Sequence, residues 1–347
     1  MVLLARSTRQ IVIAQRLLVA HAGFVADFFE HIRREDLGPE DRRNSLCTDL
    51  LDQGDDFRRG RIGEVAGLDR ADHLASDEIW RRWFHRWGRV EAGQERSVWR
   101  GALLVVLPSL ALAGAWALSS EAGYRYALYP LELVLMVVLM GAPGWRKVLR
   151  AYSDAWRRGD MQAAWHHVQE RLPASERGAA LSPEAMHLSV SRALMVSVFE
   201  RFFLVVFWYA VGGIALAFLA RGLVALAGQW PQAAARERYQ RAARLIGWIP
   251  SRLLSCTFGL AGDLAGWSRE IRKVFPGFGK KTADVLMISA NGSLTGYALD
   301  PARFSELHPE EWPDFGGRSL SAIRDLLNRS MLVWICAFAL LVIAGVT

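Results

Sequence analysis

Long uncharged stretches alternate with strongly charged ones along this 347-residue chain. Residues 101–120 and 202–220 carry no charge, residues 126–145 carry one, and the last 18 residues carry none. A run of about 20 apolar residues is long enough to cross a hydrocarbon core of roughly 30 Å as a helix. The pattern therefore predicts an all-α, polytopic helical membrane protein with cytoplasmic helical segments.

The first two apolar runs are joined by only five residues, 121–125, which predicts a transmembrane hairpin. Trp116, Tyr124 and Tyr129 cluster near its tip, as aromatic residues do at a membrane interface. The tip carries one arginine, whereas basic residues crowd both open ends. The positive-inside rule then puts both open ends in the cytoplasm. Those basic residues are Arg81, Arg82, Arg86, Arg89, Arg96, Arg100, Arg146, Lys147 and Arg150.

An amphipathic helix is expected just before the hairpin. Large apolar residues recur there at helical spacing between arginines, and the sequence Ser76-Asp77-Glu78 is suited to capping the helix start. Such a helix lies either on a membrane surface or against the rest of the protein, and the pattern does not separate the two. The apolar residues are Ile79, Trp80, Trp83, Phe84 and Trp87.

The centre of the chain holds two further apolar runs. Residues 202–220 lie between the pair Glu200-Arg201 and Arg221, and residues 245–262 are interrupted by Pro250 and Arg252. Four arginines between the runs would lie outside the cell if the first run crossed outward, against the positive-inside rule. One interpretation has a single crossing in each run, which we favour. In the other, both runs dip into the membrane and return.

The remaining segments are predicted to be cytoplasmic helices, a terminal span and a weakly structured start. Gly159 and Asp160 end one helix and cap the next, and Ser182-Pro183 begins a third that runs on toward residue 202. The predicted segments are 1–75 (variable and weakly structured), 76–145 (amphipathic helix and hairpin), 146–198 (cytoplasmic helical hairpin), 199–267 (membrane core), 268–329 (cytoplasmic segment) and 330–347 (final transmembrane helix).

The charge balance changes the expected partners more than the expected fold. The formal net charge is +7, and the arginines gather at the ends of apolar runs, which favours an anionic bilayer over nucleic acid. The glycines before Lys280 do not fit the spacing of a phosphate-binding loop. No metal-ligand spacing, cofactor motif or nucleophile–base pair is visible. We therefore expect no cofactor, no metal and no catalytic residue.

Ionisable residues within or beside the central apolar runs are the candidate ligand-binding or structural residues, because charge at bilayer depth is costly and marks function. The expected partners are the lipid bilayer, an anionic small ligand and a cytoplasmic regulatory protein. Arg252 is expected either to snorkel to the interface or to pair with Glu200, with Asp263 or with an anionic ligand. The six candidates are Glu200, Arg201, Arg221, Arg244, Arg252 and Asp263.

Four short motifs, in order along residues 76–347, carry a resemblance to a known family. Residues 152–160, 200–213, 247–263 and 328–335 are similar to motifs of AmpE-type membrane proteins, which are implicated in regulating beta-lactamase induction and are related to the cobinamide-phosphate synthases CobD/CbiB. The resemblance implies a multi-pass protein of the bacterial inner membrane with a regulatory or sensing role linked to cell-wall recycling.

The synthase relatives imply an alternative function, an enzyme that condenses a corrinoid acid with an amino alcohol phosphate. In that reading Arg244 and Arg252 would hold phosphate. Those enzymes carry an Asp-Gly-x-x-Ala-Pro signature near their third span, where this chain has Glu200 followed by apolar residues. The regulatory function is therefore the one expected here.

Overall fold

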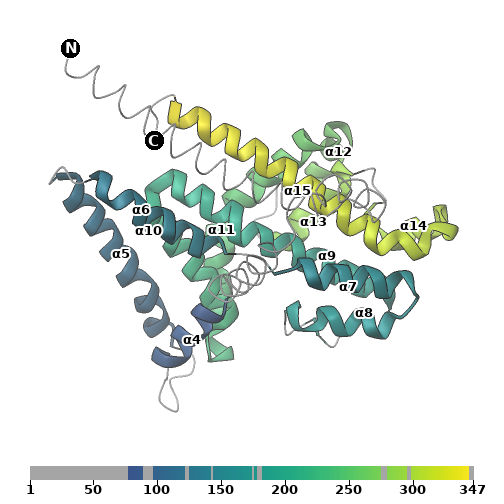
Figure 1. The fold of residues 1–347 in the computed structure, drawn as a ribbon, viewed down its shortest axis with the longest axis horizontal. Coiled ribbons are helices and arrows are strands. Elements are labelled where there is room, and N and C mark those ends of the chain that lie inside the picture. Colours follow the sequence, from purple (N-terminus) through teal and green to yellow (C-terminus); the bar gives the residue numbers. More distant parts are fainter. Residues whose placement is uncertain are drawn as a thin grey trace, which may run out of the picture. The chain divides into compact units, whose positions relative to one another are not determined.

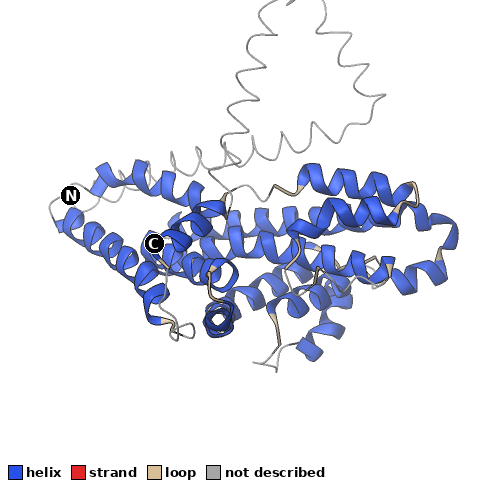
Figure 2. Cartoon of the chain, turned by 90° about the horizontal axis from the view of Figure 1, so that it is seen from below, coloured by secondary structure: helices blue, strands red, loops and turns tan. Residues whose placement is uncertain are grey.

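The computed structural model describes residues 77–88, 97–121, 125–141, 144–173, 176–177, 182–274, 280–294 and 298–343. Every regular element within these ranges is helical, which confirms the all-α prediction (Figure 2). The predicted weakly structured segment 1–75 lies outside the described residues. In chain order (Figure 1) the elements are α4 (Glu78–Trp87), α5 (Trp99–Glu121), α6 (Arg125–Met140), α7 (Arg146–Arg157), α8 (Met161–Val168), η1 (Gln169–Arg171), α9 (Pro183–Val198), η2 (Phe199–Phe203), α10 (Leu204–Gln229), α11 (Ala233–Ala261), α12 (Leu264–Val274), α13 (Thr282–Ser293), α14 (Pro301–Leu307), η3 (Pro309–Glu311) and α15 (Trp312–Ile343).

The chain forms two compact units. Residues 72–333 make up one, and residues 1–71 with 334–347 make up the other. Of the second unit only the end of α15 is described. The described part of the predicted terminal span, residues 330–343, belongs to a longer helix that already begins at Trp312. All contacts discussed below lie within the unit formed by residues 72–333.

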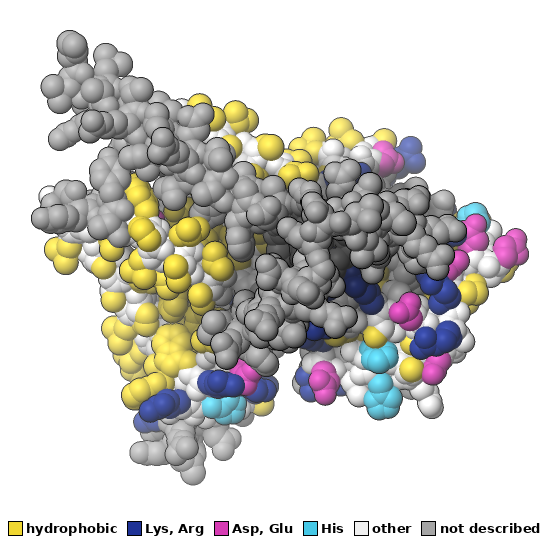
Figure 3. Space-filling view, in the orientation of Figure 1, with side chains coloured by type: hydrophobic (Ala, Val, Ile, Leu, Met, Phe, Trp, Pro, Cys, Tyr) yellow, Lys and Arg dark blue, Asp and Glu magenta, His cyan; other side chains and the backbone are white. Residues whose placement is uncertain are grey.

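Among the described residues, two helical stretches are long and apolar enough to cross a membrane, Trp99–Ser119 and Pro183–Gln229. Only 17% of the apolar window of the first and 28% of that of the second is buried inside the structure, unlike the core helix of a soluble protein. Figure 3 shows hydrophobic side chains gathered over α5, whereas charged side chains and histidines gather around α7 and α8. These helices support an association with a membrane. Helix α6, the second arm of the predicted hairpin, has only 16 residues.

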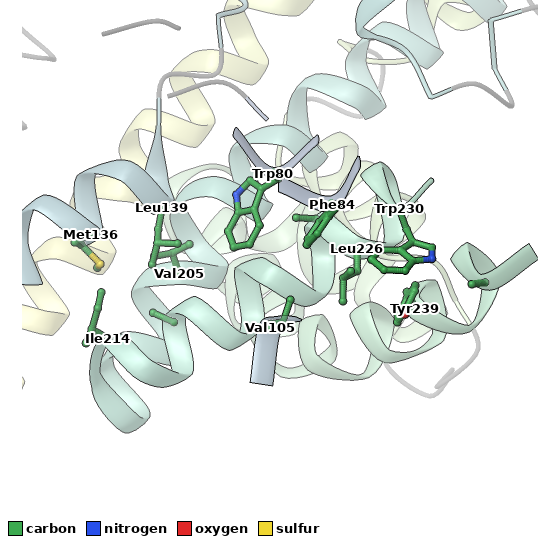
Figure 4. Close-up of a cluster of buried hydrophobic side chains, with 13 residues drawn as sticks. Trp80, Phe84, Val105, Met136, Leu139, Val205, Ile214, Leu226, Trp230 and Tyr239 are labelled. Atoms are coloured by element: carbon green, nitrogen blue, oxygen red, sulfur yellow. The ribbon is translucent and has the colours of Figure 1, made fainter. Parts of the chain in front are cut away.

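A large apolar cluster joins α4, α5, α6, α10 and α11 (Figure 4). Trp80 and Phe84 of α4 are buried in it, and the ring of Phe84 meets that of Trp230 edge-on with centroids 5.8 Å apart. Of the two interpretations of the amphipathic helix, the structure therefore shows packing against protein. Asp77 is the N-cap residue of α4, but its side chain makes no capping hydrogen bond.

Helix α10 contains a chain reversal, which the favoured interpretation of one crossing did not predict and the second interpretation allowed. Gly212 and Gly213 leave the helical conformation, and Gly213 has φ 68° and ψ −165°, a region open essentially to glycine alone. Without this break, Arg201 and Arg221 would lie about 30 Å apart along one helix. Both instead contact the same carboxylate, that of Asp77. Residues 202–220 are thus two short helical segments that fold back on each other, and the prediction of one uninterrupted helix there was wrong.

The second central run, residues 245–262, is more continuous than predicted. Pro250 does not end the helix, because α11 runs from Ala233 to Ala261 without a break. The arginines that precede this run lie on the first half of α11. The segment 268–329, predicted as a cytoplasmic segment, is largely helical where it is described. It includes most of α12, all of α13 and α14, and the start of α15.

The predicted start and stop signals around α7, α8 and α9 are confirmed. Gly159 has φ 75° between α7 and α8, where a side chain would be strained. The carboxylate of Asp160 accepts a hydrogen bond from the Ala163 N–H at 2.9 Å. Ser182 caps α9 in the same way through the Ala185 N–H at 3.2 Å, with Pro183 in the first turn.

The Gly262-x-x-x-Gly266 spacing permits a close approach between helices, as expected from small residues. A Cβ atom on Gly266 would lie 2.3 Å from the backbone oxygen of Gly292 in α13. We predict that Gly266→Ala lowers the free energy of unfolding by about 1–3 kcal/mol, because backbone must move to admit the methyl group. Thermal unfolding in detergent measures the effect. Gly228→Ala is the matched control, since nothing lies within 4 Å of a Cβ there. Equal stability of the two variants would contradict the prediction.

Candidate functional site

Two of the six sequence-predicted site residues lie on an irregular turn. Glu200 and Arg201 belong to η2, a π-helical turn between α9 and α10. A π-turn adds one residue to the helical repeat and so rotates the side chains that follow it, and such turns are frequent at functional sites. This turn directs Arg201 into the interior, where its side chain is only 11% exposed.

The structure brings Arg201 together with Arg221 around one carboxylate. Nη2 of Arg201 lies 3.0 Å from Oδ2 of Asp77, and Nη2 of Arg221 lies 2.5 Å from Oδ1. The Arg221 side chain is 4% exposed and that of Asp77 is 39% exposed. The carboxyl group of Glu200 interacts electrostatically with Asp77, Arg201 and Arg221. Two guanidinium groups thus face two carboxyl groups, and the pairing with Asp77 offsets the cost of burying the arginines.

A small pocket of about 90 Å³ opens beside this cluster. Asp77, Arg201 and Arg221 supply its charged lining, and the rest is apolar or aromatic. The pocket is built by α4, α6, η2 and α10, so the reversal at Gly212 and Gly213 is what brings its two arginines together. Its apolar lining consists of Ile79, Trp80, Trp83, Leu135, Val138, Leu139 and Phe218.

Asp77 is the site residue that the sequence analysis missed. Its position before an amphipathic helix favoured a capping role, but the side chain binds arginines 124 and 144 positions further along the chain. No local pattern encodes a pairing over that separation. The sequence offers only a weak signal for this role, a charged residue at the start of a helix. That signal does not identify the arginines that Asp77 binds.

Of the six predicted site residues, only Arg201 and Arg221 line this pocket; Glu200 adjoins Arg201 in the chain but does not line it, and the other three lie elsewhere. Arg244 is exposed on α11. Asp263 is exposed in the turn before α12, where its carboxylate accepts a hydrogen bond from the Ala265 N–H at 2.9 Å. Arg252 is buried, with its guanidinium carbon 4.8 Å from the centroid of the Trp248 ring and Nη1 3.2 Å from the hydroxyl of Ser251. The pairing of Arg252 with Glu200 or Asp263 stays a prediction.

The Arg252→Lys variant separates a planar, stacked guanidinium from a snorkelling charge. Lysine keeps the charge but cannot stack a flat group on the Trp248 ring. We expect the variant to insert at normal abundance and to lose about 0.5–1 kcal/mol of stability. Thermal unfolding of the purified protein measures this, with Arg244→Lys as the exposed control. Equal stability and an intact cellular phenotype would remove Arg252 from the candidate residues.

A second buried polar cluster lies between α7, α9 and α15. The hydroxyl of Tyr152 is 3.1 Å from Nδ1 of His187, and Nε2 of the same ring is 2.9 Å from the hydroxyl of Ser319. Burial holds the pKa of Tyr152 well above its usual range, so the phenol stays protonated. Serine and histidine at this distance resemble a nucleophile and its base. All three side chains are buried, however, which makes the cluster a structural network between helices.

Within the described ranges, no three or more His, Cys, Asp or Glu side chains gather in a way that could hold a metal ion. His166 and His167, adjacent on α8, share no such group.

The chemistry that the described arrangement offers is recognition of an anion by the Arg201–Arg221 pair. Two guanidinium groups supply forked N–H donors that match carboxylate and phosphate oxygens.

Comparison with known proteins identifies no relative. No protein-family model matches the chain, and no curated protein or solved structure is significantly similar to it.

Proposed function

We propose that this protein is a multi-pass protein of the bacterial inner membrane with a regulatory or sensing role, linked to beta-lactamase induction and cell-wall recycling. The observation that carries the proposal is the buried pair Arg201–Arg221 on a broken helix within an apolar stretch. Irregular backbone and ionisable side chains are retained at bilayer depth where they serve a function. The four motifs similar to AmpE-type proteins supply the specific process.

Deletion of the gene tests this role in a strain that carries an inducible beta-lactamase. We expect the deletion to change the induction response to a beta-lactam, and a plasmid copy of the wild-type gene to restore it. A copy with Arg221→Gln should fail to restore it at matched membrane abundance, whereas a copy with the exposed-site change Arg82→Gln should succeed. An unchanged response in the deletion strain would refute the regulatory role.

The alternative is the condensing enzyme that acts on a corrinoid acid and an amino alcohol phosphate. One observation favours it, the presence of two buried guanidinium groups at a pocket, because arginine forks bind phosphate well. The phosphate-binding role expected of Arg244 and Arg252 would then pass to Arg201 and Arg221. Growth of a strain blocked at this step of cobalamin assembly decides the matter, since rescue by this gene would replace the regulatory proposal.

A further inference from the structure

Arg221 has more hydrogen-bonding capacity than Asp77 uses. Its guanidinium group carries five N–H donors, and Asp77 accepts from the Nη2 group. Nε of Arg221 is buried and has no hydrogen-bond partner among the described residues. A buried donor without a partner is costly. This donor therefore points to a ligand that offers more acceptor oxygens than one carboxylate does.

The occupant now in place is the most exposed member of the cluster. Asp77 stands at the start of α4, with its side chain 39% exposed, whereas the two arginines are almost fully buried. Of the three groups, Asp77 is thus the one that an incoming anion can displace. With Asp77 withdrawn, the two guanidinium charges lose the carboxylate that they share, which leaves excess positive charge beside the pocket.

The apolar lining of the pocket narrows the class of anion. Trp80, Trp83 and Phe218 form one side, and their ring centroids lie 5.4 to 6.3 Å apart. Leu135, Val138 and Leu139 of α6 form another, and Val134 and Val137 on the same helix are exposed. A small hydrated anion gains nothing from such walls. An anion attached to hydrocarbon gains from both the arginines and the walls.

We propose that the Arg201–Arg221 pocket binds the phosphate group of an anionic phospholipid, and that Asp77 occupies the phosphate position as an intramolecular substitute. The lipid phosphate would bind both guanidinium groups and reach Nε of Arg221, with hydrocarbon along α6. Binding and release of Asp77 are therefore mutually dependent. The site rests on the proposed membrane location but is independent of the role in beta-lactamase induction.

Lipid binding to the full-length protein in a neutral detergent tests the proposal. The probes are phosphatidylglycerol, phosphatidylcholine with the same acyl chains, and inorganic phosphate, and bound copies are counted by native mass spectrometry. We expect Asp77→Asn to tighten phosphatidylglycerol binding several-fold, because the competing carboxylate is gone. Arg221→Gln should weaken it on the order of tenfold or more, as expected for a lost charge-assisted hydrogen bond. Glu78→Gln and Arg82→Gln, an exposed pair on α4, are the matched controls and should change neither.

Three outcomes would overturn the proposal. The first is that Asp77→Asn binds phosphatidylglycerol no more tightly than wild type does. The second is that phosphatidylcholine binds as well as phosphatidylglycerol. The third is that inorganic phosphate binds as tightly as the lipid, which would make the site one for free phosphate. Should Arg221→Gln fail to fold, the melting temperature of Asp77→Asn decides. It should rise with phosphatidylglycerol by more than that of Glu78→Gln. Lipid binding without an effect of gene deletion on induction would refute only the regulatory role.

Discussion

Replacing Asp77 by alanine should lower the free energy of unfolding by about 3 kcal/mol, more than replacing Arg221 by methionine. The reason is the difference in burial between the partners. Removal of Asp77 takes away the carboxylate that two buried guanidinium groups share, and an uncompensated buried charge is strongly destabilising. Removal of Arg221 leaves a carboxylate that is 39% exposed and still bound by Arg201 at 3.0 Å. Methionine also fills much of the vacated apolar space.

The order of the two effects is the test, measured by unfolding of the purified protein in mixed detergent micelles. Glu78→Ala is the control, because the Glu78–Arg82 pair on the same helix is exposed and contributes less than about 1 kcal/mol. The double variant should lose less than the sum of the two single variants, since the groups are in contact. A larger loss for Arg221→Met than for Asp77→Ala would show that Arg221 acts through contacts other than this ion pair.

The sequence predicts those parts of the fold that depend on local pattern. Apolar runs, capping residues and helical spacing define most of the helices, and the caps at Asp160 and Ser182 have the expected hydrogen bonds. These features depend on residues within one or two turns of each other. The assignment of 79–87 as an amphipathic helix is of this kind, and its side chains Trp80 and Phe84 are the ones buried.

The sequence does not predict features that depend on a few dihedral angles or on distant partners. A Gly-Gly pair in an apolar run is compatible with a continuous helix. The chain turns back within residues 202–220 because Gly212 and Gly213 adopt non-helical dihedral angles, which the sequence does not specify. Pro250 was expected to interrupt its run, yet α11 continues through it, because proline removes only one backbone donor and packing can retain the helix.

The candidate site likewise combines features that local pattern predicts with contacts between distant residues that it does not predict. Charge beside apolar runs made Glu200, Arg201 and Arg221 candidates, and the structure places Arg201 and Arg221 against one carboxylate. That carboxylate belongs to Asp77, which lies more than 120 positions earlier in the chain, so spacing rules do not identify it. Arg252 was equally prominent in sequence, but it stacks on its own helical neighbour Trp248.

The largest expected effect lies away from the arginine pair, at His187. Replacing His187 by alanine should lower the free energy of unfolding by about 3–5 kcal/mol, because it empties a fully buried position and leaves two hydroxyl groups without their partner. The ring also packs against Trp156 and Phe315, with centroids 5.4 and 4.8 Å away, so the cavity would be lined by large rigid side chains. Such a site collapses poorly.

A comparison of variants separates the cavity from the lost hydrogen bonds at His187. Tyr152→Phe removes one hydroxyl without a cavity and should cost about 1 kcal/mol. His187→Phe restores most of the volume but leaves Tyr152 and Ser319 unsatisfied. Adding Tyr152→Phe and Ser319→Ala to it should then recover stability, because apolar groups that replace all members of a buried network leave no donor unpaired. If the triple variant is less stable than His187→Phe alone, the network does not stabilise the junction of α7, α9 and α15 in the way that its geometry indicates.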